Sequence, residues 1–184
     1  RAALKKERRG ATSEMKSNED NARRPQFSVV TCCYNQGPYL KDCIESVLNQ
    51  QYPNFEHIIV DDGSKDNTRE VATSYPHVRY IYQDNAGQSA ALNRGFKEAR
   101  GDIIAWVNSD DYFSPQAFHR IADEMDPERG RLIVAGAAKV VNAEGHYMWL
   151  LKNGNVGFFR LLLHPRISPY NGWTVMPCQP SVFF

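Results

Sequence analysis

The sequence predicts an α/β fold in which a mostly parallel, twisted sheet carries helices on both faces. Three observations lead to this prediction. Strand-like stretches of five to seven residues alternate with helical stretches, no internal repeat interrupts the alternation, and the run at 102–107 has the composition of a buried strand. Strands joined by helices pair in parallel, and the helices then cover both faces of the sheet. A chain of 184 residues is long enough for one such domain.

The first part of the alternation is clear in the spacing of apolar residues. A β-branched stretch at 27–33 predicts the first strand, and Gly-Pro at 37–38 opens a helix. That helix has one apolar stripe at helical spacing, made of Leu40, Cys43, Ile44, Val47 and Leu48. Pro-Asn at 53–54 ends the helix, and 55–60 is the second predicted strand.

The same alternation continues to the fourth strand. A helix is predicted over about 66–75, where Asp-Asn-Thr forms a cap-like start, and 78–82 is the third strand. A helix over 88–99 leads to the fourth strand at 102–107. In that helix the residues expected to face the sheet are Leu92, Phe96 and Ala99.

Beyond the fourth strand the pattern becomes less regular. Ser114 as N-cap and Pro115 at the first helical position predict a further helix. Its expected buried face consists of Phe118, Ile121, Ala122 and Met125. A fifth strand is predicted at 131–141 with a hairpin partner at 146–151, and after about residue 150 aromatic, Pro and Gly residues dominate.

Residues 1–26 are predicted to be a disordered linker, because they are polar and charged and lack a long apolar stripe. They carry eight Lys and Arg and four Asp and Glu, whereas residues 27–184 carry fourteen and seventeen. The slightly acidic body argues against nucleic acid as a partner. The basic residues of the linker allow only peripheral contact with a membrane.

The location and redox state follow from what the sequence lacks. No stretch is long and apolar enough to span a membrane, and no signal peptide opens the chain, so we expect a cytoplasmic protein, with the cytoplasmic membrane surface as an alternative. The cysteines lack metal-ligand spacing and are expected to be buried and reduced. They are Cys32, Cys33, Cys43 and Cys178. Because the chain starts at Arg and stops in an apolar run, we expect a segment truncated at its C-terminus.

A polar, turn-forming cluster follows each of the first four predicted strands. The clusters lie at 34–37, 61–64, 84–88 and 108–111. Because parallel strands end at one edge of a sheet, the clusters are expected to converge there, where open α/β sheets bind ligands. Two of them contain Asp-Asp pairs, which favours a divalent metal shared with substrate phosphates. The alternative is a set of ordinary Asx turns. Tyr34 is available to pack on a base, and neither a dinucleotide fingerprint nor a P-loop is present.

Five segments then resemble family 2 glycosyltransferases of the GT-A fold, in order and spacing. They read VTCCYNQGPYL at 30–40, SVLNQQYPNFE at 46–56, VDDGSKDNT at 60–68, GQSAALNRG at 87–95 and GDIIAWVNSDD at 101–111. The resemblance implies a GT-A-type sheet and a nucleotide-sugar-binding domain over 27–184, incomplete at its C-terminus. It also implies a nucleotide-diphosphate sugar as ligand, with a UDP-sugar favoured, and a saccharide or glycolipid acceptor.

Carried onto this sequence, the resemblance assigns roles to five residues. Tyr34 would form part of the wall that stacks on the base, and Asp62 would hydrogen-bond the base. Asn108 and Asp110 fall on the family's Asp-x-Asp motif, in which Asp110 would coordinate Mn²⁺ or Mg²⁺ beside the diphosphate. Asp111 would orient water or the sugar. The amide at Asn108 departs from the motif and removes one negative charge beside the metal.

These assignments predict an inverting, metal-assisted glycosyltransferase of the hexosyltransferase type, acting in polysaccharide biosynthesis. The family's general base is a carboxylate later in the chain, and no Asp or Glu follows Glu144 in this sequence. That absence and Asn108 leave a non-catalytic nucleotide-sugar-binding or scaffold domain as the alternative. A nucleotidyltransferase is a weaker rival, because the loop at 34–37 lacks a basic residue. His57 is expected to be a strand-face residue, and Arg94 either reaches the diphosphate or is solvated.

Overall fold

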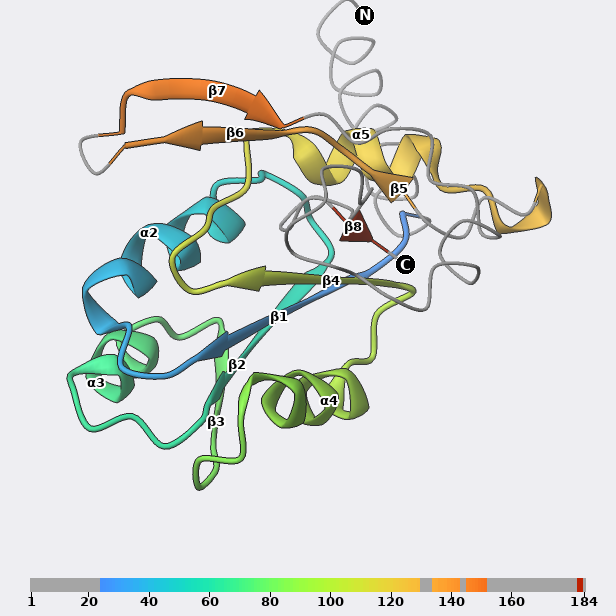
Figure 1. Cartoon of the computed structure of the whole chain (residues 1–184). Coiled ribbons are helices and arrows are strands. Elements are labelled where there is room, and N and C mark those ends of the chain that lie inside the picture. Colours follow the sequence, from blue (N-terminus) through green and yellow to red (C-terminus); the bar gives the residue numbers. More distant parts are fainter. Residues whose placement is uncertain (1–23, 130–133, 143–144, 152–181, 184) are drawn as a thin grey trace, which may run out of the picture.

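The computed structural model describes residues 24–129, 134–142, 145–151 and 182–183, which build an α/β domain on one large sheet (Figure 1). The sheet has six strands in the order β3-β2-β1-β4-β8-β5. Their bounds are β1 Phe27–Cys33, β2 Phe55–Asp61, β3 Val78–Tyr82, β4 Ile103–Asn108, β5 Val134–Ala135 and β8 Val182–Phe183. The pairs β1–β2, β1–β4 and β2–β3 are parallel, and β8 is antiparallel to β4 and β5. The predicted mostly parallel sheet is confirmed.

The strand order places a topological switch point between β1 and β4. From β1 the chain moves outward through β2 to β3, and then returns to the other side of β1 as β4. After β1 and after β4 the chain turns away in opposite directions, and this opens a crevice between the carboxyl ends of the two strands. Any ligand site of this sheet is therefore expected at the ends of these two strands.

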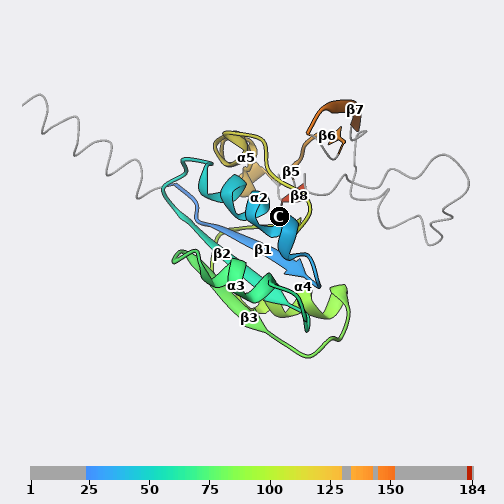
Figure 2. The same cartoon turned by 90° about the vertical axis from the view of Figure 1, so that its left-hand side faces the viewer.

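Helices cover both faces, as predicted. They are α2 Gly37–Leu48, α3 Thr68–Thr73, α4 Gln88–Glu98 and α5 Ala117–Glu124, followed by the 3₁₀ turn η1 Pro127–Arg129. Figures 1 and 2 show α4 on one side of the sheet and α2, α3 and α5 on the other. Alternate residues of β1 serve the two cores: Cys33 packs with Leu40 of α2, and Cys32 packs with Ala91 of α4.

The residues of α4 predicted to face the sheet do so, together with two smaller residues. Leu92 and Ala99 are half-buried against the core around Cys32, and Phe96 is half-buried beside Trp106 of β4. Ala91 and Gly95 are fully buried. The reason is close packing of the helix backbone on β1, since a Cβ at Gly95 would lie 2.3 Å from Cγ1 of Val30. Only glycine fits this approach, so the backbone of α4 lies directly on β1 at this position.

Two predicted element boundaries are wrong. The helix expected from Ser114-Pro115 begins at Ala117, because Gln116 adopts a left-handed φ of 61° and interrupts the helical path. Phe118 and Ile121 are nevertheless buried, as expected. The single strand expected at 131–141 is two short strands in different sheets: β5, and β6 Ala138–Val141, which pairs antiparallel with β7 Tyr147–Leu151. The hairpin partner predicted at 146–151 is confirmed.

The predicted linker ends earlier than residue 26. Residues 1–23 lie outside the described part of the chain, so the expectation of disorder there stays a prediction. Arg24 stacks over the ring of Tyr52 at 5.9 Å, and Pro25 accepts a 2.8 Å hydrogen bond from the Tyr52 hydroxyl. The amide of Gln26 donates to Asp102. These three residues therefore belong to the domain.

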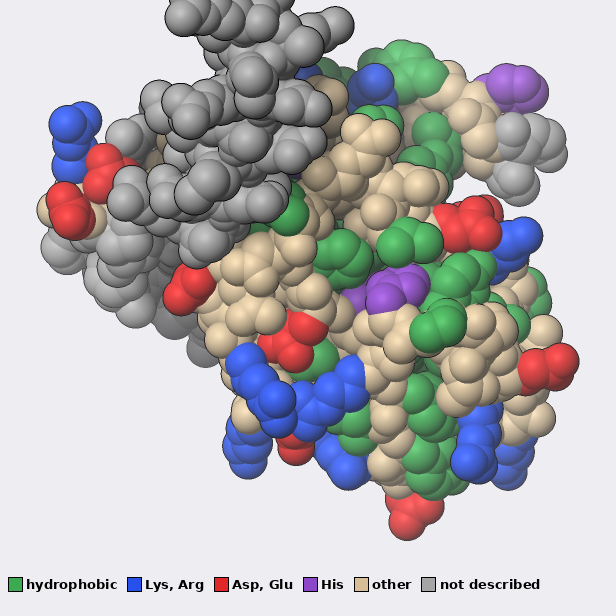
Figure 3. Space-filling view, turned by 180° about the vertical axis from the view of Figure 1, so that it is seen from behind, with side chains coloured by type: hydrophobic (Ala, Val, Ile, Leu, Met, Phe, Trp, Pro, Cys, Tyr) green, Lys and Arg blue, Asp and Glu red, His purple; other side chains and the backbone are tan. Residues whose placement is uncertain are grey.

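The described cysteines and the surface fit the expectations from composition. Cys32, Cys33 and Cys43 are buried and unoxidised, and burial raises the pKa of the Cys43 thiol to about 12; Cys178 lies outside the described residues. Acidic and basic side chains are interspersed on the face seen from behind (Figure 3), in keeping with a net charge of +1. Within the described ranges, every helix is too short or too polar to cross a membrane.

Candidate functional site

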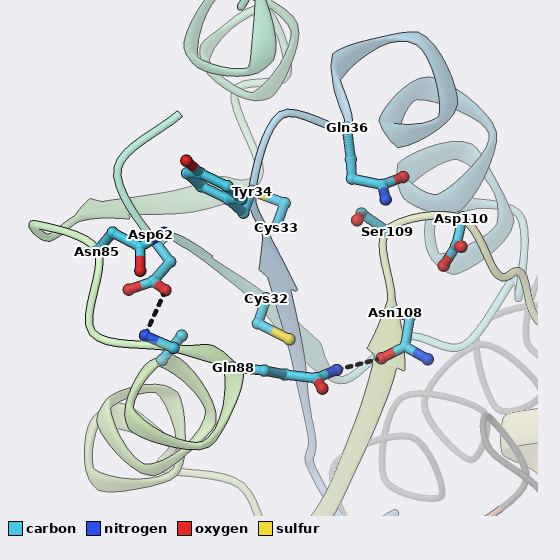
Figure 4. Close-up of a pocket in the computed structure, with 12 residues that line it drawn as sticks. Cys32, Cys33, Tyr34, Gln36, Asp62, Asn85, Gln88, Asn108, Ser109 and Asp110 are labelled. Carbon is cyan, nitrogen blue, oxygen red and sulfur yellow. Dashed lines mark hydrogen bonds between the residues drawn. The ribbon is translucent and has the colours of Figure 1, made fainter. Parts of the chain in front are cut away.

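A cavity of about 380 Å³ opens at the carboxyl edge of the sheet, at the switch point between β1 and β4 (Figure 4). All four strand-end clusters contribute to its wall, so their predicted convergence is confirmed. The lining residues are Cys32, Cys33, Tyr34, Gln36, Asp62, Asn85, Gly87, Gln88, Ala91, Asn108, Ser109 and Asp110. The size falls in the usual range for small-molecule sites. Four of the five residues predicted to form a site lie here, and Asp111 does not.

Asp62 is almost fully buried, and its carboxylate organises the loop that follows β3. Its Oδ1 accepts hydrogen bonds from Gln83 Nε2 at 2.6 Å and from the amide of Ala86 at 2.9 Å, and its Oδ2 accepts from the amide of Gly87 at 2.8 Å. A carboxylate has about four lone-pair positions. Three are therefore used by the protein, and about one is left for a ligand that enters the cavity.

Asp61, the neighbour of Asp62, has a purely structural environment. Its Oδ1 accepts from the amide of Ser64 at 2.8 Å, and its Oδ2 accepts from the Tyr80 hydroxyl at 2.6 Å. Burial, together with this bond to Asp61, raises the pKa of Tyr80. Because Asp61 is buried away from the cavity wall, the expectation that four carboxylates gather at the site is wrong for this residue.

The loop after β1 is fixed to the loop after β2, and this positions Tyr34. Asn35 has a left-handed φ of 54°. Its backbone N–H donates to Ser64 Oγ at 2.9 Å, and its side-chain Oδ1 accepts from the backbone N–H of Lys65 at 2.8 Å. The amide of Gly37 donates to Asp66 Oδ2 at 3.0 Å. Tyr34 lies between these anchors with 48% of its surface exposed, and its ring borders the cavity.

The Asn108–Asp111 cluster forms the wall opposite Asp62. Asn108 Oδ1 accepts a 3.0 Å hydrogen bond from Gln88 Nε2, and Asn108 Nδ2 donates at 3.0 Å to Asp111 Oδ2. Burial, and to a smaller extent the charge of Asp110, raises the pKa of Asp111. Asp111 is directed toward a second cavity, whereas Asp110 is exposed and borders both.

The chemistry of Asp110 fits a hard divalent cation that is shared with a ligand. In the described part of the chain, no group of three His, Cys, Asp or Glu side chains is placed to hold a metal by itself. Mg²⁺ and similar ions are commonly bound by one or two carboxylates together with substrate phosphates. The residues present therefore suit a metal that arrives with a phosphorylated ligand, and they do not form a complete metal cage.

The second cavity, of about 900 Å³, lies between α2, the loop after β4 and the β6–β7 hairpin. It meets the first cavity at Gln36 and Asp110, which line both. Asp42, Glu45, Asp110 and Asp111 contribute carboxylates to its wall, and Tyr39 and Tyr112 contribute exposed rings. The two cavities thus share a boundary at which two bound molecules can meet.

Two further residues considered from sequence lie away from both cavities. His57 is fully buried, shares a 2.9 Å hydrogen bond with Thr31 Oγ1, and burial lowers its pKa to about 3, so it is a strand-face residue as expected. Arg94 is exposed and donates to the carbonyl of Tyr82 at 3.0 Å. Gln36 and Gln88 do line the cavity, and their places in the strand-end clusters were the only signal for them in the sequence.

Comparison with known proteins places this geometry in a family. The model of the family described as "Glycosyl transferase family 2" matches residues 28–182. An uncharacterized glycosyltransferase of Rickettsia typhi is 32% identical over 136 residues, which cover 73% of this chain and 43% of the relative. EpsJ of Bacillus subtilis, another uncharacterized glycosyltransferase, is 36% identical over 62% of this chain and 35% of the relative. The chain thus spans less than half the length of these relatives.

Solved structures of glycosyltransferases resemble this chain as well. TarS 1–349 of S. aureus in complex with UDP is 27% identical, with a TM-score of 0.60 over 66% of this chain and 38% of that chain. The same protein in complex with UDP-GlcNAc has a TM-score of 0.58. The mannosyltransferase PcManGT of Pyrobaculum calidifontis, in complex with GDP-Man and Mn²⁺, is 23% identical with a TM-score of 0.50 and shares the fold.

Proposed function

The chain belongs to glycosyltransferase family 2, and from this premise we propose that its first cavity binds a nucleotide-diphosphate sugar, with a UDP-sugar favoured, for inverting transfer to a saccharide or lipid-linked acceptor. Its relatives are named glycosyltransferases, so glycosyl transfer itself is the family activity. The nucleotide, the assisting metal, the acceptor class and the inversion are the parts that we propose for this protein.

The observation that carries the proposal is the placement of three different chemistries around one cavity. Tyr34 provides an aromatic ring at the mouth of the cavity, and Asp110 provides an exposed carboxylate on the opposite wall. Asp62 provides a carboxylate in the wall that already accepts three hydrogen bonds. A base can stack on the ring and donate an N–H to the remaining lone pair of Asp62. The diphosphate then extends toward Asp110. TarS, with 27% identity, binds UDP and UDP-GlcNAc, which supports a uridine nucleotide.

Asp110 is the residue that would hold Mn²⁺ or Mg²⁺ together with the phosphates. When bound, such an ion neutralises the charge that grows on the leaving diphosphate. Asn108 contributes no charge here, and its amide oxygen already accepts from Gln88. The affinity for the ion without nucleotide is therefore expected to be low.

The acceptor is proposed to occupy the second cavity, because that cavity meets the first at Asp110. In an inverting transfer the acceptor oxygen bonds to the anomeric carbon while the bond from that carbon to the diphosphate oxygen breaks. A carboxylate takes the hydroxyl proton. Asp111 borders the second cavity and is proposed to orient the acceptor. We place the reaction in the cytoplasm, or at the cytoplasmic membrane surface.

Titration calorimetry tests the donor site directly. We expect UDP and UDP-sugars to bind the chain in the presence of Mn²⁺, and Asp110→Ala to weaken this binding about tenfold or more, because one charged metal ligand is lost. Asp84→Ala is the matched control: it removes an exposed carboxylate from the same edge that lines neither cavity. Unchanged binding by Asp110→Ala, or no metal-dependent nucleotide binding at all, contradicts the proposal.

A second candidate, a nucleotide-sugar-binding domain without catalysis, is favoured by one observation. Position 108, which falls on the family's Asp-x-Asp motif, carries an amide in place of a carboxylate. Release of UDP from UDP-sugar in the presence of saccharide acceptors separates the two candidates. Turnover by the full-length protein supports the enzyme, and tight nucleotide binding without turnover by the full-length protein supports the binding domain.

A further inference from the structure

Three side chains form a hydrogen-bonded series that runs from the wall of the first cavity to the wall of the second. Gln88 is the first residue of α4, Asn108 is the last residue of β4, and Asp111 lies in the following loop. Gln88 Nε2 donates to Asn108 Oδ1, a bond drawn in Figure 4, and Asn108 Nδ2 donates to Asp111 Oδ2, each at 3.0 Å. The series thus joins two elements that are twenty residues apart in sequence.

The direction of this series is fixed by chemistry. An ionised carboxylate only accepts hydrogen bonds, so Asp111 must face the NH₂ group of Asn108. The carbonyl oxygen of Asn108 then faces Gln88, which must present its own NH₂ group. An aspartate at position 108 would accept from Gln88 equally well but would oppose Asp111 with a like charge. The amide at 108 is therefore what permits Asp111 to be held against it.

The consequence concerns the two neighbouring carboxylates. Asp111 lines only the second cavity, whereas Asp110 lines both. As long as Asn108 holds Asp111, the nucleotide cavity presents the carboxylate of Asp110 and not that of Asp111. The orientation of Asn108 in turn depends on Gln88, which is the partner on its other side.

We infer that Gln88 is a positioning residue: it fixes the amide of Asn108, which holds Asp111 on the acceptor side and leaves Asp110 to face the nucleotide. This inference rests on the proposed function, since it assigns the first cavity to the nucleotide. Gln88 acts through Asn108 and needs no contact with the ligand. Its effect must therefore disappear when Asn108 can no longer transmit it.

A double-mutant cycle measures this dependence. Calorimetry gives Kd for UDP with Mn²⁺ in the wild type, Gln88→Leu, Asn108→Ala and the double variant. We expect Gln88→Leu to raise Kd about fivefold in the wild-type background, the worth of one neutral hydrogen bond, and less than about twofold in the Asn108→Ala background. Gln88→Ala serves as a second variant. Ser89→Ala, at the adjacent exposed helix position, is the matched control and is expected to leave Kd unchanged.

The opposite results are equally clear. A fivefold loss that persists in the Asn108→Ala background means that Gln88 touches the nucleotide directly, and it overturns the inference. So does a loss of binding that is matched by a fall in the melting temperature of the free protein, because that reports damage to α4. Equal Kd values for Gln88→Leu and the wild type also overturn it.

A second readout needs no ligand and separates this inference from the proposed function. In ¹⁵N-resolved NMR spectra of the free protein, Gln88→Leu is expected to shift the side-chain NH₂ signals of Asn108 and the backbone amide of Asp111. Unchanged signals overturn the inference. If the wild type binds no nucleotide while these signals do shift, the proposed function is lost and the hydrogen-bonded series stands.

Discussion

Asp61-Asp62 and Asp110-Asp111 are the same dipeptide at the ends of two parallel strands, yet the protein uses them in opposite ways. Asp61 and Asp62 are both almost fully buried, and between them they accept hydrogen bonds from Ser64, Tyr80, Gln83, Ala86 and Gly87. Asp111 accepts from Asn108, and Asp110 is exposed between two cavities. The first pair is held by five hydrogen bonds, although Asp62 also lines the first cavity, whereas Asp110 of the second pair is exposed to both cavities.

The position of each strand in the sheet explains the difference. β2 lies between β1 and β3, and its two carboxylates accept from Tyr80 of β3, from the loop after β3 and from Ser64 in the loop after β2 itself. β4 has β1 on one side and the antiparallel β8 on the other, and within the described residues β8 pairs with it only at Ala105. Among the described residues, no parallel neighbour on that side surrounds Asp110. The pair with five hydrogen bonds is thus the one whose strand has parallel neighbours on both sides.

The comparison is tested most strongly by Asp62→Ala. This change removes the nearly buried carboxylate that accepts from the amides of Ala86 and Gly87 and from the Gln83 side chain. We expect a loss of about 3 kcal/mol in the free energy of unfolding, measured by urea denaturation, since several bonds to a charged acceptor are lost together. A loss below about 1 kcal/mol would mean that Asp62 is not a structural residue.

Tyr80→Phe tests the other member of the first pair with a smaller change. It removes the hydroxyl that donates to Asp61 Oδ2 at 2.6 Å and leaves a buried carboxylate oxygen without that partner. The expected cost is about 2 kcal/mol in the same denaturation experiment. Tyr82→Phe, at an exposed position of the same strand, is the control and is expected to change stability by less than about 0.5 kcal/mol.

Asn108→Asp makes the second pair into a cluster of three carboxylates. Asp111 loses its donor and gains a like-charged neighbour, so we expect a stability loss of about 1 kcal/mol in metal-free buffer. Because a cation compensates the added charge, millimolar Mn²⁺ is expected to restore the melting temperature of this variant more than that of the wild type. Equal responses of the two proteins to Mn²⁺ would contradict a metal role for this cluster.

The sequence was sufficient for the alternation of elements, the convergence of four strand-end clusters and the family, because these depend on local periodicity and turn chemistry. Turn chemistry alone was insufficient to tell Asp61 from Asp62 or Asp110 from Asp111, since adjacent side chains differ only in the loops that reach them, and only the family resemblance distinguished them. The start of α5 depended on the left-handed Gln116, and the full burial of Gly95 in α4 depended on its close approach to Val30. Neither feature can be predicted from the spacing of hydrophobic residues.

The central claim, that Asp110 serves a ligand and not the fold, is tested most directly by measuring stability and binding on one preparation of Asp110→Asn. Urea denaturation is expected to show a change within about 0.5 kcal/mol of the wild type, because the side chain is exposed. Calorimetry is expected to show Mn²⁺-dependent UDP binding weakened about tenfold or more. Wild-type UDP affinity in this variant, or a stability loss comparable to that of Asp62→Ala, would contradict the account.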